Sequence, residues 1–78
     1  MKIFVGNLDE KIQSNHLKEA FQDFGIVSSA KVITDRKSGK SKGFGFIEMP
    51  NPEEAKKVID TINGGTWEGK VITIREAY

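Results

Sequence analysis

Four segments of the 78-residue chain alternate with period two between small or aliphatic side chains and a second set that always includes a charge. Such alternation is typical of strands in a sheet with one buried and one exposed face. The aliphatic set must face the core, because burying an unpaired Lys or Arg costs several kcal/mol. The charged set is therefore expected on an open face, and its members are Lys2, Phe4 and Gly6; Lys31 and Ile33; Lys42, Phe44, Phe46 and Glu48; and Thr73, Arg75 and Ala77.

Two amphipathic helices separate these strands. The first is predicted to start at an N-cap, Ser14, and to end at a C′ glycine, Gly25. The second is predicted from three adjacent signals: Asn51 as N-cap, Pro52 at the first helical position and Glu54 as a capping-box carboxylate. Apolar residues recur at helical spacing in both, namely Leu17, Ala20, Phe21 and Phe24 in the first and Ala55, Val58, Ile59 and Ile62 in the second.

The predicted order is strand, helix, strand, strand, helix, strand, with strands at 2–8, 26–34, 42–49 and 71–77. Two helices of about ten residues cover only one face of a four-stranded sheet. The sequence therefore predicts an α+β fold, a ferredoxin-like βαββαβ sandwich with a four-stranded antiparallel sheet and two helices on one face. Residues 1–78 are expected to form a single domain.

Composition excludes several classes of protein. The chain has no Cys, which rules out disulfides and thiolate metal sites, and no nucleophile, base and orienting group can be assembled from its residues. No apolar run approaches the length of a membrane span, and the N-terminus lacks the apolar region of a signal peptide. We expect a cytoplasmic protein that is not an enzyme, with no metal, cofactor, small-molecule substrate or membrane partner; His16 and Trp67 are expected to serve surface and packing roles.

The open face should carry three phenylalanines, Phe4, Phe44 and Phe46. Clustered exposed rings mark an interaction site, although the rings could instead be core, or a terminal segment could fold over them. Nucleobases stack on aromatic rings while nearby cations take the phosphates, and only single strands offer free base faces. The net charge of +1 hides a block at residues 31–42 with five Lys or Arg and one Asp, a local charge of +4.

Two motifs resemble those of the RNA recognition motif family. Ile3 to Leu8 is similar to its hexapeptide and Lys42 to Met49 to its octapeptide, at the family's usual separation, and the likeness extends over the whole chain. Met49 departs from the aromatic residue that the octapeptide prefers, and alternation places it on the helix side. A single domain of this kind is most similar to the short single-domain bacterial members.

The resemblance implies a role for each matching position. Phe4 and Phe44 would each stack on a base, Phe46 would pack against sugar, and Lys42 would pair with phosphate. Base edges would be read by Asn7, Arg75, Ala77 and Tyr78. Phosphate contacts are also expected from Arg75 and from the loop cations Arg36, Lys37 and Lys40, with Lys2 and Lys31 contributing less.

The favoured hypothesis is a monomeric module that binds single-stranded RNA. Single-stranded DNA stays open as a ligand, because nothing in the sequence reveals a preference for the 2′-OH. The alternative is a protein-interaction module of the same fold, since some members use the sheet or the helical face to bind proteins. The octapeptide also resembles the central motif of cold-shock domains, but two amphipathic helices disfavour that all-β fold.

Overall fold

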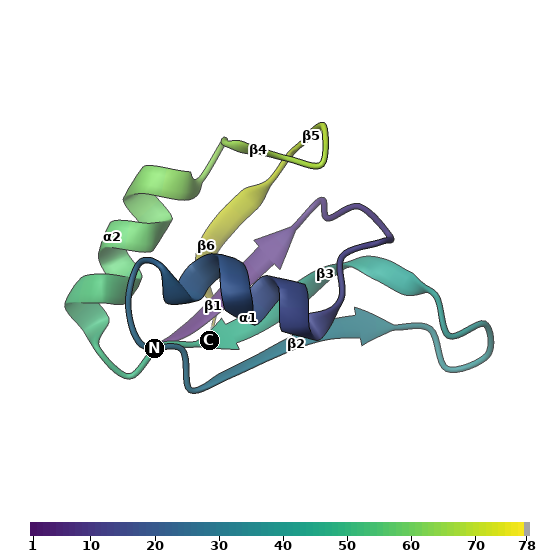
Figure 1. Ribbon diagram of the computed structural model, residues 1–78, viewed down its shortest axis with the longest axis horizontal. Coiled ribbons are helices and arrows are strands. Elements are labelled where there is room, and N and C mark those ends of the chain that lie inside the picture. Colours follow the sequence, from purple (N-terminus) through teal and green to yellow (C-terminus); the bar gives the residue numbers. More distant parts are fainter. Residues whose placement is uncertain (78) are drawn as a thin grey trace.

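The computed structural model describes residues 1–77, so Tyr78 lies outside the described residues. Helices α1 and α2 lie on one side of a four-stranded antiparallel sheet, which confirms the predicted sandwich (Figure 1). No helix in this part of the chain is long and apolar enough to cross a membrane. The elements in chain order are β1 (Lys2–Gly6), α1 (Ser14–Gln22), β2 (Ser29–Thr34), β3 (Ser41–Glu48), α2 (Pro52–Ile62), β4 (Thr66–Trp67), β5 (Lys70–Val71) and β6 (Thr73–Ala77).

The sheet has the order β2-β3-β1-β6, so the two strands that carry the motifs lie at its centre. Phe4 of β1 is paired with Phe46 of β3 on one side and with Arg75 of β6 on the other. Lys31 of β2 completes this row, because it is paired with Phe46. One line across the sheet therefore reads Arg75, Phe4, Phe46, Lys31, all on the same face.

The core consists of the aliphatic set, as predicted. Helix α1 packs against β2 and β3, and α2 packs against β6. Met49 is fully buried, which confirms its predicted place on the helix side. The buried hydrophobic residues are Ile3, Val5, Val32, Ile47 and Ile74 from the sheet, Leu17, Phe21, Ala55 and Val58 from the helices, and Leu8, Ile12, Val27, Met49 and Ile72 from the connecting segments.

A bulge interrupts the alternation at the start of β3. Thr34 is paired with Ser41 and Val32 with Gly45, so three residues of β3 lie opposite one of β2. Gly43, in the middle of this bulge, has a φ of 85°, in the left-handed region that glycine adopts without strain. The period-two argument that grouped Lys42 with Phe44 therefore does not apply across this step; Lys42 is nonetheless exposed.

The predicted cap of the first helix was wrong by one residue. Gln13 is the N-cap, and its backbone N–H donates to Nδ1 of His16 at 3.1 Å. Ser14 is the first helical residue, and its hydroxyl oxygen accepts the backbone N–H of Val32 at 2.9 Å. The serine thus fastens α1 to β2, and His16, though exposed as predicted, also helps to cap the helix.

At the second helix one signal is confirmed and one is wrong. Asn51 is the N-cap, with its side-chain oxygen accepting the N–H groups of Glu53 and Glu54 at 2.9 and 3.3 Å. Glu54 does not reach back in a capping box. Its Oε1 accepts the backbone N–H of Ile26 at 3.2 Å, and a Cβ on Gly25 would lie 2.6 Å from the Glu54 carboxyl carbon. Gly25 is therefore needed for close approach of Glu54, rather than for a left-handed cap.

The sequence predicts one strand over 71–77, but in the structure this segment is divided between two strands, β5 and β6. The segment before β6 forms a small hairpin of β4 and β5, with a turn at Glu68 and Gly69 where both φ values are positive. Trp67 lies in this hairpin and meets the ring of Phe21 edge-on at 6.4 Å, as its predicted packing role requires. Phe24, expected on the buried stripe, is 40% exposed, because α1 ends at Gln22 before this position.

Candidate nucleic-acid interface

Three phenylalanine rings form one cluster in the middle of the face that the helices leave open. The centroids of Phe4 and Phe44 are 5.8 Å apart with the rings 29° from parallel, and Phe46 meets both rings edge-on at 5.8 and 6.1 Å. Each ring is half-buried. The prediction that the rings lie on the open face is confirmed. They are less exposed to solvent than alternation alone implies, because each ring covers part of the other two.

Two cations lie over this ring cluster from opposite ends. The Lys2 ammonium is 4.6 Å from the centroid of Phe46, and the Arg75 guanidinium carbon is 4.9 Å from that of Phe4. Such contacts are worth about 0.5–1 kcal/mol at exposed sites, which is less than base stacking provides. A ligand that stacks on the rings would therefore displace either cation at a small cost in free energy.

The remaining cations lie at the ends of the face. Lys31 is exposed next to Phe46 on the outer strand β2. Arg36, Lys37 and Lys40 are exposed in the loop that joins β2 to β3, which projects beyond the rest of the molecule (Figure 1).

Asp35 holds the projecting loop in shape. Its Oδ1 accepts the backbone N–H groups of Lys37 and Ser38 at 2.8 and 3.1 Å. These hydrogen bonds, that of Ser38 above all, lower the pKa of the Asp35 carboxyl below its ordinary value. The loop cations are thus presented on an ordered turn rather than on a free segment.

The positions expected to read base edges divide into three cases. The side-chain amide of Asn7 donates one N–H to the carbonyl oxygen of Val71 at 2.6 Å, so it fastens the end of β1 to the β4–β5 hairpin and leaves its second N–H and its oxygen for a ligand. Arg75 is exposed and Ala77 is half-buried on β6, in the positions expected for them. Tyr78 lies outside the described residues.

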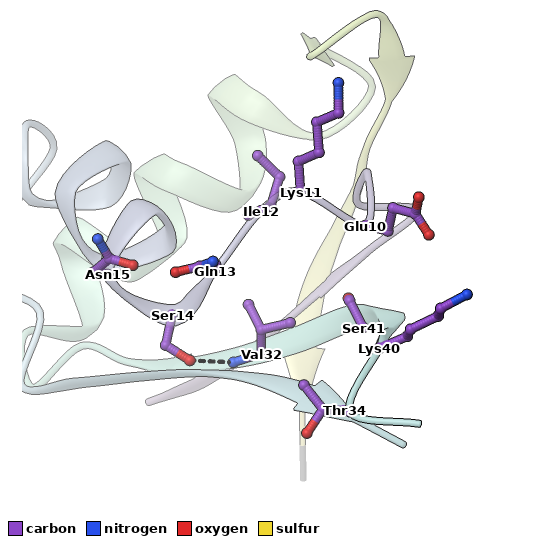
Figure 2. Close-up of a pocket in the computed structure, with 11 residues that line it drawn as sticks. Glu10, Lys11, Ile12, Gln13, Ser14, Asn15, Val32, Thr34, Lys40 and Ser41 are labelled. Carbon is purple, nitrogen blue, oxygen red and sulfur yellow. Dashed lines mark hydrogen bonds between the residues drawn. The ribbon is translucent and has the colours of Figure 1, made fainter. Parts of the chain in front are cut away.

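A different hollow, of about 540 Å³, lies away from the rings. It is formed by the β1–α1 connection, the start of α1 and the β2–β3 hairpin, and Figure 2 shows Glu10, Lys11 and Lys40 around it. The hydrogen bond from the Val32 N–H to Ser14 closes its floor (Figure 2). Acidic and basic groups line it together, so it presents no field of one sign to a phosphate.

One residue of the open face received no role from the sequence. Glu48 ends β3 opposite Lys2 on one side and Ser29 on the other, and it brings a carboxylate onto a face otherwise supplied with cations. The signal was present in the octapeptide, since alternation already grouped Glu48 with Phe44 and Phe46.

Comparison with known proteins finds sequence relatives and solved structures that match this chain over most of its length. The family model of the RNA recognition motif matches residues 3–73. The chain is 48% identical over 68 residues to the Caenorhabditis elegans cytotoxic granule-associated RNA binding protein tiar-1, covering 87% of this chain and 16% of that protein. It is 34% identical over 77 residues to RbpE of a Nostoc strain, covering 99% of this chain and 78% of RbpE.

A solved structure of the RNA binding protein PG1 superimposes with a TM-score of 0.96 at 39% identity, over 99% of this chain and 93% of that one. The chain spans 16% to 48% of the length of tiar-1 and four plant relatives, all of which are larger proteins. The match to the family model, the order of the elements and the three rings on the open face agree, and the chain belongs to the RNA recognition motif family.

Proposed function

We propose that the open face binds single-stranded RNA, with bases stacked on the ring cluster of Phe4, Phe44 and Phe46. The observation that carries this proposal is the cluster itself, three half-exposed rings in mutual contact at the centre of the sheet with a cation over each end. Rings that only filled a core would be covered by apolar groups. The three rings stay half-exposed, and besides one another they are covered by the side chains of Lys2 and Arg75, two cations that a base can displace.

The phosphates are proposed to follow the cations around the ring cluster. Arg75 lies on one side of the rings and Lys31 on the other, in the same row of the sheet. Lys42 and the loop cations Arg36, Lys37 and Lys40 extend the positive charge along the β2–β3 hairpin. The names of tiar-1 and PG1 describe them as RNA-binding proteins, which supports the same ligand for this chain.

The roles of the individual residues are part of the proposal. Phe4 and Phe44 each stack on a base, Phe46 packs against sugar, and Ala77, Tyr78 and the free N–H and oxygen of the Asn7 amide are proposed to contact base edges. Residues 1–78 act as one module, without catalysis. The monomeric state and the cytoplasmic location stay predictions.

The proposal is tested by removing one ring and measuring the affinity for a labelled single-stranded RNA by fluorescence anisotropy. Stacking is worth about 1–3 kcal/mol per base, so Phe44→Ala is expected to weaken binding about 5- to 150-fold. Phe24→Ala is the matched control, because it removes an exposed ring from the end of α1. Equal affinity of wild type and Phe44→Ala would contradict the proposal.

Leucine variants separate the two kinds of contact. A leucine side chain still packs against a sugar but offers no π-face to a base. Phe44→Leu is therefore expected to lose affinity while Phe46→Leu keeps most of it. The reverse order would assign base stacking to Phe46 and the sugar contact to Phe44.

Salt dependence tests the phosphate contacts. With three or four phosphates neutralised, the slope of log affinity against log salt is expected to be roughly −2 to −3, at ~0.7 per contact for single strands. A slope near zero would exclude these contacts. Repeating the titration with single-stranded DNA tests whether the 2′-OH contributes.

One observation favours the alternative, a protein-interaction module. An apolar hollow of about 230 Å³ lies between the two helices and the β4–β5 hairpin, with Phe24, Trp67 and Ile62 in its lining. It is on the helix side, so occupancy there and RNA binding on the sheet are distinguished by which amides shift in an NMR titration. A sheet whose amides do not shift on adding RNA would favour the alternative.

A further inference from the structure

Glu48 is the one carboxylate that β1, β2, β3 and β6 place on the open face. The other face residues of these strands are neutral or cationic. A carboxylate here repels phosphates, and so weakens binding to every RNA alike unless a particular ligand compensates for it. A group of this kind on a binding face typically contributes to specificity.

In the described part of the chain, the Glu48 carboxylate has no recorded ion pair with the two lysines nearest to it, Lys2 and Lys31. Lys2 is directly opposite Glu48 in register, but the Lys2 ammonium lies over the Phe46 ring instead. Among residues 1–77, the ion pair recorded for Glu48 is with the Met1 ammonium at 3.8 Å, and its side chain is 46% exposed. The backbone beneath it is fixed, because the Glu48 carbonyl oxygen accepts the Ser28 N–H at 2.9 Å. The strand end is thus held in place, and the Glu48 carboxylate is exposed enough to meet a ligand.

A hollow of about 390 Å³ opens beside this carboxylate, between β3 and the outer strand β2. Phe46, Ile33 and Ile47 contribute its apolar lining, while Glu48, Ser29 and the two lysines Lys2 and Lys31 contribute polar groups. Apolar walls that bury a flat ring, with a few polar groups to orient it, are typical of a site for a small aromatic ligand. Because the Phe46 ring belongs both to this hollow and to the ring cluster, a base in the hollow would be next to those on the rings.

We propose that this hollow receives a guanine of the bound RNA and that Glu48 selects it. The inference rests on the proposed function, because it concerns a further base of the same RNA. The Glu48 carboxylate accepts hydrogen bonds from guanine N1–H and from the N2 amino group, side by side. Lys31 and Ser29 are within the same hollow to donate to an acceptor on the base, such as O6 or N7.

The choice among the four bases follows from their Watson–Crick edges. Guanine alone has two adjacent donors, N1–H and the N2 amino group, which match the two oxygens of a carboxylate. Adenine and cytosine have a single amino donor next to a ring nitrogen that accepts. Uracil has one N–H between two carbonyl oxygens. Each of these three therefore places at least one acceptor against a carboxylate oxygen, which a hydrogen-bonding site rejects.

The test uses three sets of labelled RNA octamers in which every second position is fixed and the positions between are A, C or U. The fixed nucleotide is guanosine, inosine or uridine; inosine lacks the N2 amino group. Their affinities for wild type, Glu48→Gln and Glu76→Gln are measured by fluorescence anisotropy. Glu76→Gln is the matched control, since it removes the same charge from a residue paired with buried Ile3, on the other face of the sheet.

Wild type is expected to bind the guanosine set about 10- to 100-fold more tightly than the uridine set, with inosine between them. Glu48→Gln is expected to lose this preference through weaker binding of the guanosine set, and to bind the uridine set as tightly as wild type or more tightly. Glu76→Gln should keep the preference. A loss of affinity for the guanosine set with no loss for the uridine set distinguishes selection from simple charge repulsion, which would change both affinities in the same direction.

Two results would overturn the inference while leaving the proposed function intact. One is equal affinity of wild type for the guanosine and uridine sets, with Phe44→Ala weakening both. The other is a uniform gain in affinity for all three sets in Glu48→Gln. If wild type binds none of the sets, the proposed function and the inference fail together.

Discussion

Gly45 separates two of the rings in sequence, and the structure explains why this position accepts no side chain. A Cβ added there would lie 2.5 Å from the carbonyl oxygen of Lys31, 3.0 Å from the Cα of Val32 and 3.2 Å from Cδ2 of Leu17. Ordinary contact begins near 3.4 Å, so the Lys31 carbonyl would have to retreat by about 0.9 Å. Gly45→Ala is therefore predicted to force β2 away from β3, the strand that carries Phe44 and Phe46.

The expected cost is that of overpacking a core, about 1–3 kcal/mol. A domain of this size loses about 4–8 °C in Tm for each kcal/mol, so the predicted decrease is about 4–24 °C. Urea unfolding followed by circular dichroism measures the free energy directly, and the m value should be unchanged. RNA affinity should also fall, because Lys31 moves relative to Phe46.

Gly39→Ala is the control for this experiment. Gly39 has a φ of 74° and nothing within 4 Å of an added Cβ, so that variant suffers backbone strain without a steric clash. It should leave the amide resonances of the ring-bearing strands unchanged. A Gly45→Ala protein with wild-type stability and wild-type resonances would refute the close approach of β2 and β3.

Two hydrogen-bonded carboxylates give further predictions. The pKa of the Asp35 carboxyl is lower in the folded protein than in the unfolded chain. The hydrogen bonds from the Lys37 and Ser38 N–H groups should therefore be complete above the pKa of an unfolded Asp, and should be lost as the pH falls through the pKa of folded Asp35. Amide chemical shifts of Lys37 and Ser38 in an acid titration measure this loss. Shifts that titrate at the ordinary Asp pKa would contradict it. Glu54→Ala removes the acceptor of the Ile26 N–H and should cost about 1 kcal/mol in urea unfolding without changing RNA affinity; unchanged stability would contradict it.

Much of the candidate site could be predicted from the sequence, because alternation and charge act together. A strand has only two faces, and placing Lys2, Lys31 or Arg75 in the core would leave a buried charge unpaired. The cost of burying these charges therefore places Phe4 and Phe46 on the open face of the sheet. What alternation could not predict is how far the rings cover each other, since that depends on strand register and rotamers.

The two capping errors concern side chains that accept hydrogen bonds from distant backbone. Ser14 was expected to cap its own helix but accepts the N–H of Val32, 18 positions away. Glu54 was expected to act within its own turn but accepts the N–H of Ile26, 28 positions away. Local capping rules rank the partners within one turn, so they miss a backbone N–H donor that another segment offers in the folded chain. The hairpin of β4 and β5 did have a local signal, because Glu68 and Gly69 form a two-residue turn between short strands.

The sequence by itself determined the class of fold, the face that stays open and the rings on it, because these follow from the period of the pattern and the cost of burying charge. The tertiary structure alone decided what surrounds the rings. Lys2 and Arg75 lie over the rings, and the Asn7 side chain is hydrogen-bonded to the Val71 carbonyl. Glu48 lies at the edge of a hollow and, among residues 1–77, forms no recorded ion pair with a lysine. These arrangements depend on which strands lie side by side and in what register. Distances of that kind are set only when the strands and helices pack together.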